Sequence, residues 1–285
     1  MAQLQSNRSK IIVNIIRRNT LLVATLLVGV LVEWTLAQAK DGASTPAPAD
    51  KVAVGDSNVT GAHLKPFTNL WRMTQQKPDG PAGPVGTWSD VLETVTFQGR
   101  PAMKRTQIAK YDKKNIELHF VSIFDPKTME PFSFDYSRSD NGNVRHVGFE
   151  HATVTYRHID SAGSKPAEAT VKLGQPVFDF YGGMYGLLIS SLPLKDGYAA
   201  EIPALDTTTM AIDWVPVHVK GRETVEAGPG KKAETWMVET PTRRYGRMTW
   251  WVTKQPPYVI KAILEVPENE DGSGKVAAII TYTMV

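Results

Sequence analysis

The stretch Gly246 to Pro267, GRMTWWVTKQPPYVIKAILEVP, decides the fold prediction. It contains two runs of β-forming residues on either side of a TKQPP turn, so it predicts a β-hairpin. Successive side chains of a strand point to opposite faces of the sheet, and the adjacent Trp250 and Trp251 therefore cannot share a face. Either one tryptophan is exposed, or both faces of this sheet are covered by apolar groups.

The strands of this hairpin and the one after it each present one apolar face. Met248, Trp250 and Val252 share a face, which predicts a core on that side. The opposite face is mixed, with Trp251 among Arg247, Thr249 and Thr253. Two explanations fit Trp251: a partly covered second side, or a surface tryptophan packed on arginine and lysine stems. The residues expected to be buried are Trp250, Tyr258, Ile260, Leu264 and Ile280.

Upstream, the chain continues as short β segments joined by hairpin turns. Residues 91–108 form a hairpin around QGR, residues 115–124 alternate, and SDNGN at 139–143 is a strong turn. Regular short spacing without intervening helices favours an antiparallel meander over βαβ units. The predicted fold is mainly β, an antiparallel meander curled into an open (half) β-barrel, with one short internal helical segment on the concave side.

That helical segment is Pro176 to Leu194, PVFDFYGGMYGLLISSLPL. Its apolar residues recur at helical spacing, and Pro193 ends it. Tyrosine and methionine suit a cleft that accepts an apolar ligand. The candidate ligand-binding residues are Val177, Tyr181, Met184, Tyr185 and Leu188, together with Trp250. A permanent plug is the alternative to a mobile lid; Gly182 and Gly183 favour mobility because glycine lowers the cost of local opening.

The N-terminal region predicts export to the periplasm. A basic segment precedes the apolar run Leu21–Val32, and Ala37-Gln38-Ala39 fits a cleavage site. The domain prediction is a signal peptide at 1–39, a disordered tether at 40–64, and a single open-barrel domain at 65–285. An uncleaved anchor is the alternative, although the apolar run is shorter than the roughly 20 residues of a membrane span. No transmembrane span is expected after signal removal.

Charge and composition narrow the partner classes. The signal segment holds four of the 32 Lys and Arg and one of the 29 Asp and Glu, so the remainder has 32 − 4 = 28 basic and 29 − 1 = 28 acidic residues. This balance gives no basis for a nucleic-acid partner. The chain has no cysteine, which excludes disulfides, thiolate metal sites and a cysteine nucleophile.

Motifs for catalysis are absent from the sequence. No G-x-S-x-G or H-E-x-x-H occurs, so we predict no catalytic residue, no metal and no cofactor. His146, Glu150, His151 and His158 offer a loosely spaced metal set, against which stands the ordinary reading of scattered surface histidines. Asp179 is expected to face backbone amides at the start of the helical segment, a structural role.

Several turns and core positions carry a resemblance to a family. Gly221, Glu223 and Val225 are followed by Trp251, Thr253, Pro257 and Ile260, while Asp125, Thr128, Met129 and Pro131 form a D-x-x-T-x-x-P turn. This pattern resembles uncharacterised bacterial periplasmic proteins related to the lipoprotein-carrier (LolA/LolB-like) fold. The resemblance implies an open barrel of about eleven strands whose hydrophobic concave face is plugged by helices. It implies no known reaction or ligand.

The leading functional hypothesis is a non-enzymatic periplasmic protein that binds an apolar ligand, such as a lipid, or a cell-envelope partner. A hydrolase of envelope lipids or glycans with unrecognised acid and base residues is one alternative, and a structural interaction module is another. An aromatic cleft would favour the apolar-ligand hypothesis, and convergent carboxylates of shifted pKa would favour the hydrolase. A filled core without a cleft would favour the structural interaction module.

Overall fold

The computed structural model describes residues 50–207, 209–242, 246–269 and 274–285. The predicted signal peptide at 1–39 lies outside the described residues, as do residues 40–49 of the predicted tether. The statements that follow concern the described part of the chain.

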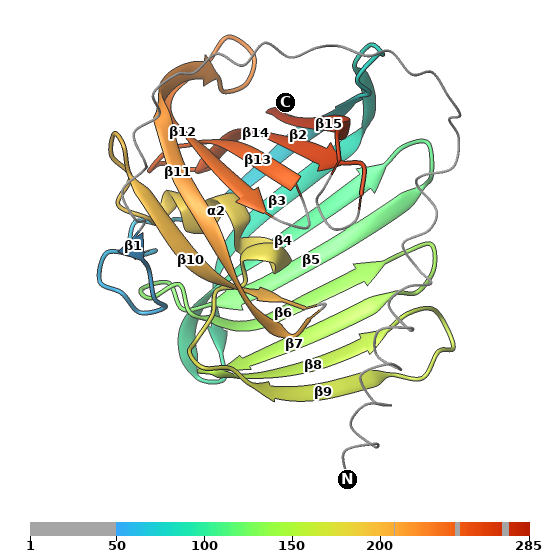
Figure 1. The fold of residues 1–285 in the computed structure, drawn as a ribbon, viewed down its shortest axis with the longest axis vertical. Helices are drawn as coiled ribbons and strands as arrows, with labels where there is room; N and C mark the ends of the chain where they lie inside the picture. Colours follow the sequence, from blue (N-terminus) through green and yellow to red (C-terminus); the bar gives the residue numbers. More distant parts are fainter. Residues whose placement is uncertain (1–49, 208, 243–245, 270–273) are drawn as a thin grey trace. The chain divides into compact units, whose positions relative to one another are not determined.

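The domain is built on a single β-sheet that curls around a short helical segment (Figure 1). The sheet has fifteen strands in the order β1-β10-β11-β12-β13-β14-β15-β2-β3-β4-β5-β6-β7-β8-β9. Its outermost strands, β1 and β9, do not pair with each other, so the sheet is not closed into a barrel. The predicted fold class, a mainly β open barrel, is confirmed.

The strands range from two to sixteen residues. Their bounds are β1 (Asp50–Lys51), β2 (Phe67–Gln76), β3 (Gly83–Phe97), β4 (Arg100–Tyr111), β5 (Ile116–Phe124), β6 (Pro131–Arg138), β7 (Val144–Glu150), β8 (Thr153–Ile159), β9 (Ala167–Lys172), β10 (Ala199–Asp206), β11 (Ala211–Glu226), β12 (Lys232–Thr242), β13 (Gly246–Val252), β14 (Val259–Pro267) and β15 (Val276–Met284).

Two antiparallel meanders, β2 to β9 and β10 to β15, make up this sheet together with β1, which pairs in parallel with β10. The predicted hairpin at 91–108 is present as β3 and β4, and its turn residues Gln98 and Gly99 both have positive φ, 51° and 77°. Positive φ at both positions is the signature of the two-residue turn that matches strand twist. Antiparallel pairing of β15 with β2 joins the two meanders, with Met284 opposite Trp71.

The helical segment is shorter than the predicted Pro176–Leu194. It consists of a π-helical turn, η1 (Phe180–Met184), followed by α2 (Tyr185–Ser190). The residues before η1 run extended, and Phe178 forms an isolated bridge with Ala204 of β10. This bridge uses backbone groups that a longer helix would need internally, which explains the later start. η1 and α2 together are called the plug below.

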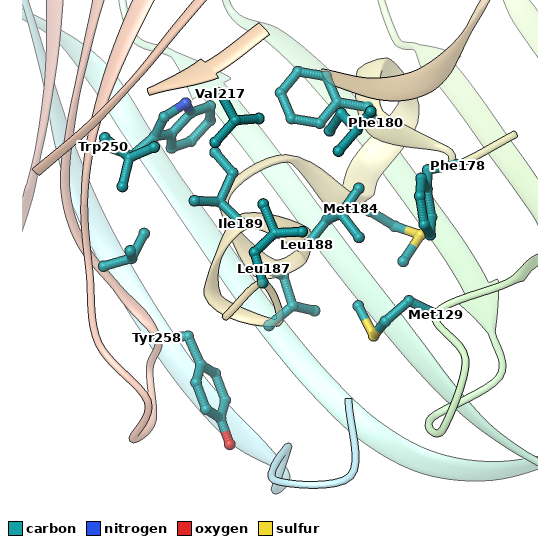
Figure 2. Close-up of a cluster of buried hydrophobic side chains, with 14 of the residues drawn as sticks. Met129, Phe178, Phe180, Met184, Leu187, Leu188, Ile189, Val217, Trp250 and Tyr258 are labelled. Atoms are coloured by element: carbon teal, nitrogen blue, oxygen red, sulfur yellow. The ribbon is translucent and has the colours of Figure 1, made fainter. Parts of the chain in front are cut away.

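The plug carries the centre of the hydrophobic core on the concave side of the sheet. Figure 2 shows Leu187, Leu188 and Ile189 of α2 surrounded by side chains from several strands and loops. All three are fully buried. A smaller second cluster, with Phe134, Val147, Val154 and Leu205 among its members, connects the inner face of β6 to β8 with the end of β10.

The predicted tether at 40–64 requires a correction, because residues 50–64 belong to the folded domain. β1 pairs in parallel with β10, and Val52, Val59 and Leu64 are buried in the main core. The Tyr258 hydroxyl accepts a hydrogen bond from the Lys65 amide at 2.6 Å and donates one to the His63 carbonyl at 3.2 Å. Val52, Val59 and Leu64 are spread through an otherwise polar segment, and their burial attaches residues 50–64 to the domain core.

Trp250 and Trp251 do lie on opposite faces, and both are only 5% exposed. Trp250 belongs to the main core, whereas Trp251 packs with Val225 and Ile260 in a small cluster on the outer face. A bulge between Val219 and Gly221 interrupts β11, and the strand also contacts β14. The two explanations for Trp251 therefore both apply in part. The outer side of the sheet is partly covered, and the Lys261 ammonium lies over the Trp251 ring at 4.3 Å.

Ile260 is buried as predicted, but strict alternation with Tyr258 and Ala262 would put it on the core face, whereas it lies in the outer cluster. The pairing of β13 with β14 shifts between Trp251, opposite Lys261, and Val252, opposite Val259. This bulge leaves Ile260 without a directly opposed residue and sends its side chain to the outer cluster. Tyr258 is fully buried, while Leu264 and Ile280 are half-buried rather than buried.

Candidate functional site

An aromatic pocket of about 230 Å³ lies between the plug and the concave face of the sheet. Nine of its lining residues are aromatic: Trp71, Trp88, Tyr111, Phe120, Phe180, Tyr181, Tyr185, Trp250 and Tyr282. The strands contribute most of them, because one face of each strand points into the curled sheet. Phe180, Tyr181 and Tyr185 of the plug complete the aromatic lining.

The structure divides the six predicted binding residues into two groups. Tyr181, Tyr185 and Trp250 line the aromatic pocket. Met184 and Leu188 are fully buried in the main core, and Val177 is buried in the second cluster. Helical spacing predicted that the five residues of the segment Pro176–Leu194 face one cleft. Val177 lies before the start of the plug, and the short plug is enclosed by the sheet on several sides.

Ring contacts hold the pocket wall in place. Trp88 stacks on Phe120 with centroids 5.3 Å apart and meets Tyr282 edge-on at 5.7 Å. Tyr185 of the plug stacks on Trp250 at 6.1 Å. Such pairs stabilise by about 0.5–1.5 kcal/mol beyond their burial, so the pocket is pre-formed. Sequence reasoning missed Trp88, Phe120 and Tyr282, because their meeting depends on strand register from β15 through β2, β3 and β4 to β5.

A buried ion pair forms the polar end of the pocket. Arg105 donates from Nε to Asp90 Oδ1 at 2.9 Å and from Nη2 to Asp90 Oδ2 at 2.6 Å. Its Nη1 donates to the carbonyls of Gly183 and Met184, at 2.8 and 3.2 Å. Both side chains are almost completely buried, at 2% and 0% exposure. Arg105 therefore fixes the plug to β4 and brings no net charge into the pocket.

Gln107 of β4 extends this network to the aromatic wall. With its amide oriented to suit its neighbours, Nε2 donates to the Gly183 carbonyl at 3.2 Å. The amide oxygen then accepts from Arg105 Nη2 at 3.3 Å and from Trp88 Nε1 at 3.1 Å. All five N–H donors of the guanidinium have acceptors in this arrangement.

Asp179 lies beneath the plug and does not line the pocket. Ser122 Oγ donates to its Oδ2 at 2.6 Å. Burial raises the pKa of this carboxyl to about 8, an effect opposed by Ser122, by the amides of Gly182 and Gly183, and by Arg105. The carboxyl faces backbone amides at the start of the plug, the position expected from the sequence, and its contacts are structural.

The two adjacent glycines of the plug have a packing reason. A Cβ on Gly182 would lie 1.8 Å from Asp179 Oδ1, and one on Gly183 would lie 2.4 Å from Ser122 Oγ. Neither position tolerates a side chain without displacing a buried group. The sequence suggested that these glycines confer mobility. The structure instead explains them by the close approach of the plug backbone to Asp179 and Ser122.

We expect Gly182→Ala to lower the free energy of unfolding by about 1–3 kcal/mol, the usual cost of overpacking. Urea denaturation measures it. The control is Gly174→Ala, because a Cβ there meets nothing within 4 Å. That substitution is expected to be neutral or stabilising by up to about 1 kcal/mol. Equal stabilities for the two variants would contradict the packing account.

The histidines considered as a metal set lie apart, each beside a different carboxylate. His146 contacts Asp135 at 2.7 Å, His158 contacts Asp160 at 3.3 Å, and His151 contacts Glu130 at 3.7 Å. Within the described residues, no group of three or more His, Cys, Asp or Glu side chains is arranged to hold a metal ion. The same part of the chain contains no helix long and apolar enough to span a membrane.

A larger groove of about 570 Å³ lies between the end of β11 and the strands β2, β14 and β15. Its lining includes Arg72, Lys261, Glu223 and Glu226. The groove lining therefore carries charges of both signs. The aromatic pocket is the better candidate site, because small-molecule sites are predominantly apolar with few polar groups.

Comparisons with known proteins identify a family and a fold. The family described as "Protein of unknown function (DUF3108)" matches residues 83–269. Among solved structures, the chain is similar to the crystal structure of a beta-barrel-like protein of the domain of unknown function DUF1849 from Brucella abortus, with a TM-score of 0.50 and 11% identity. That likeness covers 80% of this chain and 97% of the other, and it shows the fold alone. No curated protein matched.

Proposed function

We propose that this chain, which belongs to the DUF3108 family of proteins of unknown function, is a non-enzymatic periplasmic protein that binds an apolar group in its aromatic pocket. The group is part of a small apolar ligand, such as a lipid, or of a cell-envelope partner. The observation that carries the proposal is the pre-formed pocket lined by nine aromatic residues. The predicted export signal supports the periplasmic location, and the open barrel is compatible with a relationship to the lipoprotein carriers.

The electrostatics of the pocket favour an uncharged group. Asp90 neutralises Arg105, and Arg105 also donates to two plug carbonyls. An anion entering the pocket would lose its hydration without gaining a free cation, which is unfavourable in an apolar environment. A carboxylate or phosphate of a ligand would therefore stay outside, while the apolar portion enters.

The volume of the pocket limits what enters. At about 230 Å³ it is smaller than the roughly 300–1,000 Å³ typical of small-molecule sites. It accommodates one end of an apolar molecule, or an apolar side chain of a partner, rather than a complete lipid.

The enzymatic alternative has less support. A carboxyl of raised pKa is the feature that would favour catalysis. Asp179 has such a pKa, but it is buried beneath the plug and bonded to Ser122. Asp90 lies in the pocket region but is held in a bidentate pair with Arg105. Neither carboxyl is placed to exchange a proton with a ligand in the pocket.

A fluorescence experiment tests the proposal with the uncharged probe N-phenyl-1-naphthylamine. We expect saturable binding at micromolar concentrations, with energy transfer from the pocket tryptophans Trp71, Trp88 and Trp250. Leu264→Trp should weaken binding by at least about tenfold, because Leu264 lines the pocket and the larger ring fills it. The control is Ile263→Trp, the next residue of β14, which faces the outer cluster.

Far-UV circular dichroism and thermal melting establish that both variants are folded. If the probe does not bind, or if both variants bind it as the parent does, the pocket is not a binding site. A purely structural module would then be the better account of the domain.

A further inference from the structure

The sheet ends in an unpaired edge at β9, the lowest strand in Figure 1. In the part of the chain that the structure describes, no strand is hydrogen-bonded to β9 on the side away from β8. The strand is AEATVK, residues 167–172, and four of its six residues are exposed. An exposed edge of this kind is a template for pairing with another strand.

The backbone groups that face this edge follow from the register with β8. The Leu173 amide donates to the Ala152 carbonyl at 2.7 Å, which makes these two residues a hydrogen-bonded pair. Hydrogen-bonded and non-hydrogen-bonded pairs alternate along an antiparallel ladder. Lys172, Thr170 and Glu168 therefore direct their amides and carbonyls away from β8, towards the free edge.

These three residues are self-complementary. If a second copy of β9 runs antiparallel with Thr170 opposite Thr170, then Glu168 of each copy lies opposite Lys172 of the other. Ala169 then lies opposite Val171. A register shifted by one residue would place backbone groups that point to the free edge opposite groups that point to β8. A one-residue shift is therefore excluded. Among allowed registers, this one places opposite charges together on both sides of the symmetry axis.

We infer that the free edge of β9 is a docking surface for β9 of a second copy of this chain, paired antiparallel about Thr170. Such a contact is isologous, as in most homodimers. It supplies about six backbone hydrogen bonds, two at each of three opposed pairs. Its two Glu168–Lys172 pairs extend the existing contact between Arg157 and Glu168, at 3.2 Å.

The burial of the β9 side chains fits their places on the two faces of the continuous sheet that this pairing would form. Val171 and Ala169 lie on the inner face, where Val171 packs with the second cluster. Their counterparts in the second copy extend that apolar face. Glu168, Thr170 and Lys172 lie on the outer face, where they stay in contact with water. Because the edge is only six residues long, the contact is weak and reversible.

Disulfide trapping tests the register directly, since the chain contains no cysteine. In the inferred dimer the two copies of residue 170 are opposed, with Cα atoms about 5.5 Å apart, within the range a disulfide spans. Under copper–phenanthroline oxidation in air, we expect Thr170→Cys to form a covalent dimer at least about tenfold faster than Glu168→Cys. The two copies of residue 168 would be about 14 Å apart, beyond disulfide reach.

Charge reversal gives a second measurement, made by sedimentation velocity on the full exported chain. Lys172→Glu should weaken self-association at least about tenfold, because it opposes two carboxylates at each end of the contact. Combining it with Glu168→Lys should restore association. Equal rates of covalent dimer formation for the two cysteine variants, or a parent protein that stays monomeric up to millimolar concentration, would overturn the inference. Binding of only a foreign extended peptide at this edge would also overturn it.

Discussion

Replacing Arg105 with methionine is expected to lower the free energy of unfolding by about 3–5 kcal/mol, the usual cost of removing one partner of a buried ion pair. The variant leaves the Asp90 carboxylate, which is fully buried, without its cation. It also removes the Arg105 hydrogen bonds to the carbonyls of Gly183 and Met184, which leaves Gln107 as the remaining β4 donor described for Gly183. Urea denaturation monitored by tryptophan fluorescence measures the loss.

Two further variants separate this effect from a general response to mutation. Lys104→Met changes the neighbouring residue of β4, which is 38% exposed and lies 3.8 Å from Glu93. It should cost less than about 1 kcal/mol, as exposed pairs do. The double variant Asp90→Leu, Arg105→Met removes both buried charges and should recover much of the lost stability. A single Arg105→Met variant as stable as Lys104→Met would show that the ion pair does not hold the plug.

The fold class was predictable because strand alternation is a local signal. Residues 91–108 show a hairpin turn between two β runs, and both the turn and the strands are present in the structure. The register between distant strands was not predictable in the same way. The pairing of Met284 with Trp71 joins residues from opposite ends of the domain, and no local pattern encodes it.

The polar part of the site was hidden for a related reason. Arg105 and Gln107 alternate with Lys104 and Thr106, so the sequence shows polar residues on both faces of β4. A strand with polar residues on its inner face contradicts the usual pattern of an apolar core. Arg105 can be buried because Asp90 on β3 and the plug carbonyls, about eighty residues away, accept its hydrogen bonds, and the sequence of β4 shows neither partner.

The aromatic part of the site was partly visible. Helical spacing and composition predict Tyr181 and Tyr185, strand alternation predicts Trp250, and all three line the pocket. Val177, Met184 and Leu188 were chosen by the same spacing but are enclosed in the core. Periodicity identifies an apolar face, yet it does not distinguish a face that fills a core from one that borders a pocket.

Trp250→Ala is expected to lower the free energy of unfolding by about 3–5 kcal/mol, as large-to-small substitutions of buried aromatic residues do. Trp250 Nε1 donates to Thr240 Oγ1 at 2.9 Å, and Thr240 is fully buried. The ring also lies against the plug, where a Cβ on Gly186 would be 2.9 Å from Trp250 Cε3. Truncation therefore removes packing and leaves a buried hydroxyl without its donor.

The matched control is Trp251→Ala, because Trp251 is adjacent in sequence and equally buried, yet lies on the outer face. Its Nε1 donates to Glu223 at 2.6 Å at the edge of a groove open to water, so its loss should cost less than that of Trp250. The two variants should also differ in their effect on binding of the naphthylamine probe. Trp250→Ala changes the wall of the aromatic pocket and should alter the affinity for the naphthylamine probe, whereas Trp251→Ala should not. If Trp250→Ala left the denaturation midpoint and slope unchanged, Trp250 would not be the contact that fixes the plug to β13.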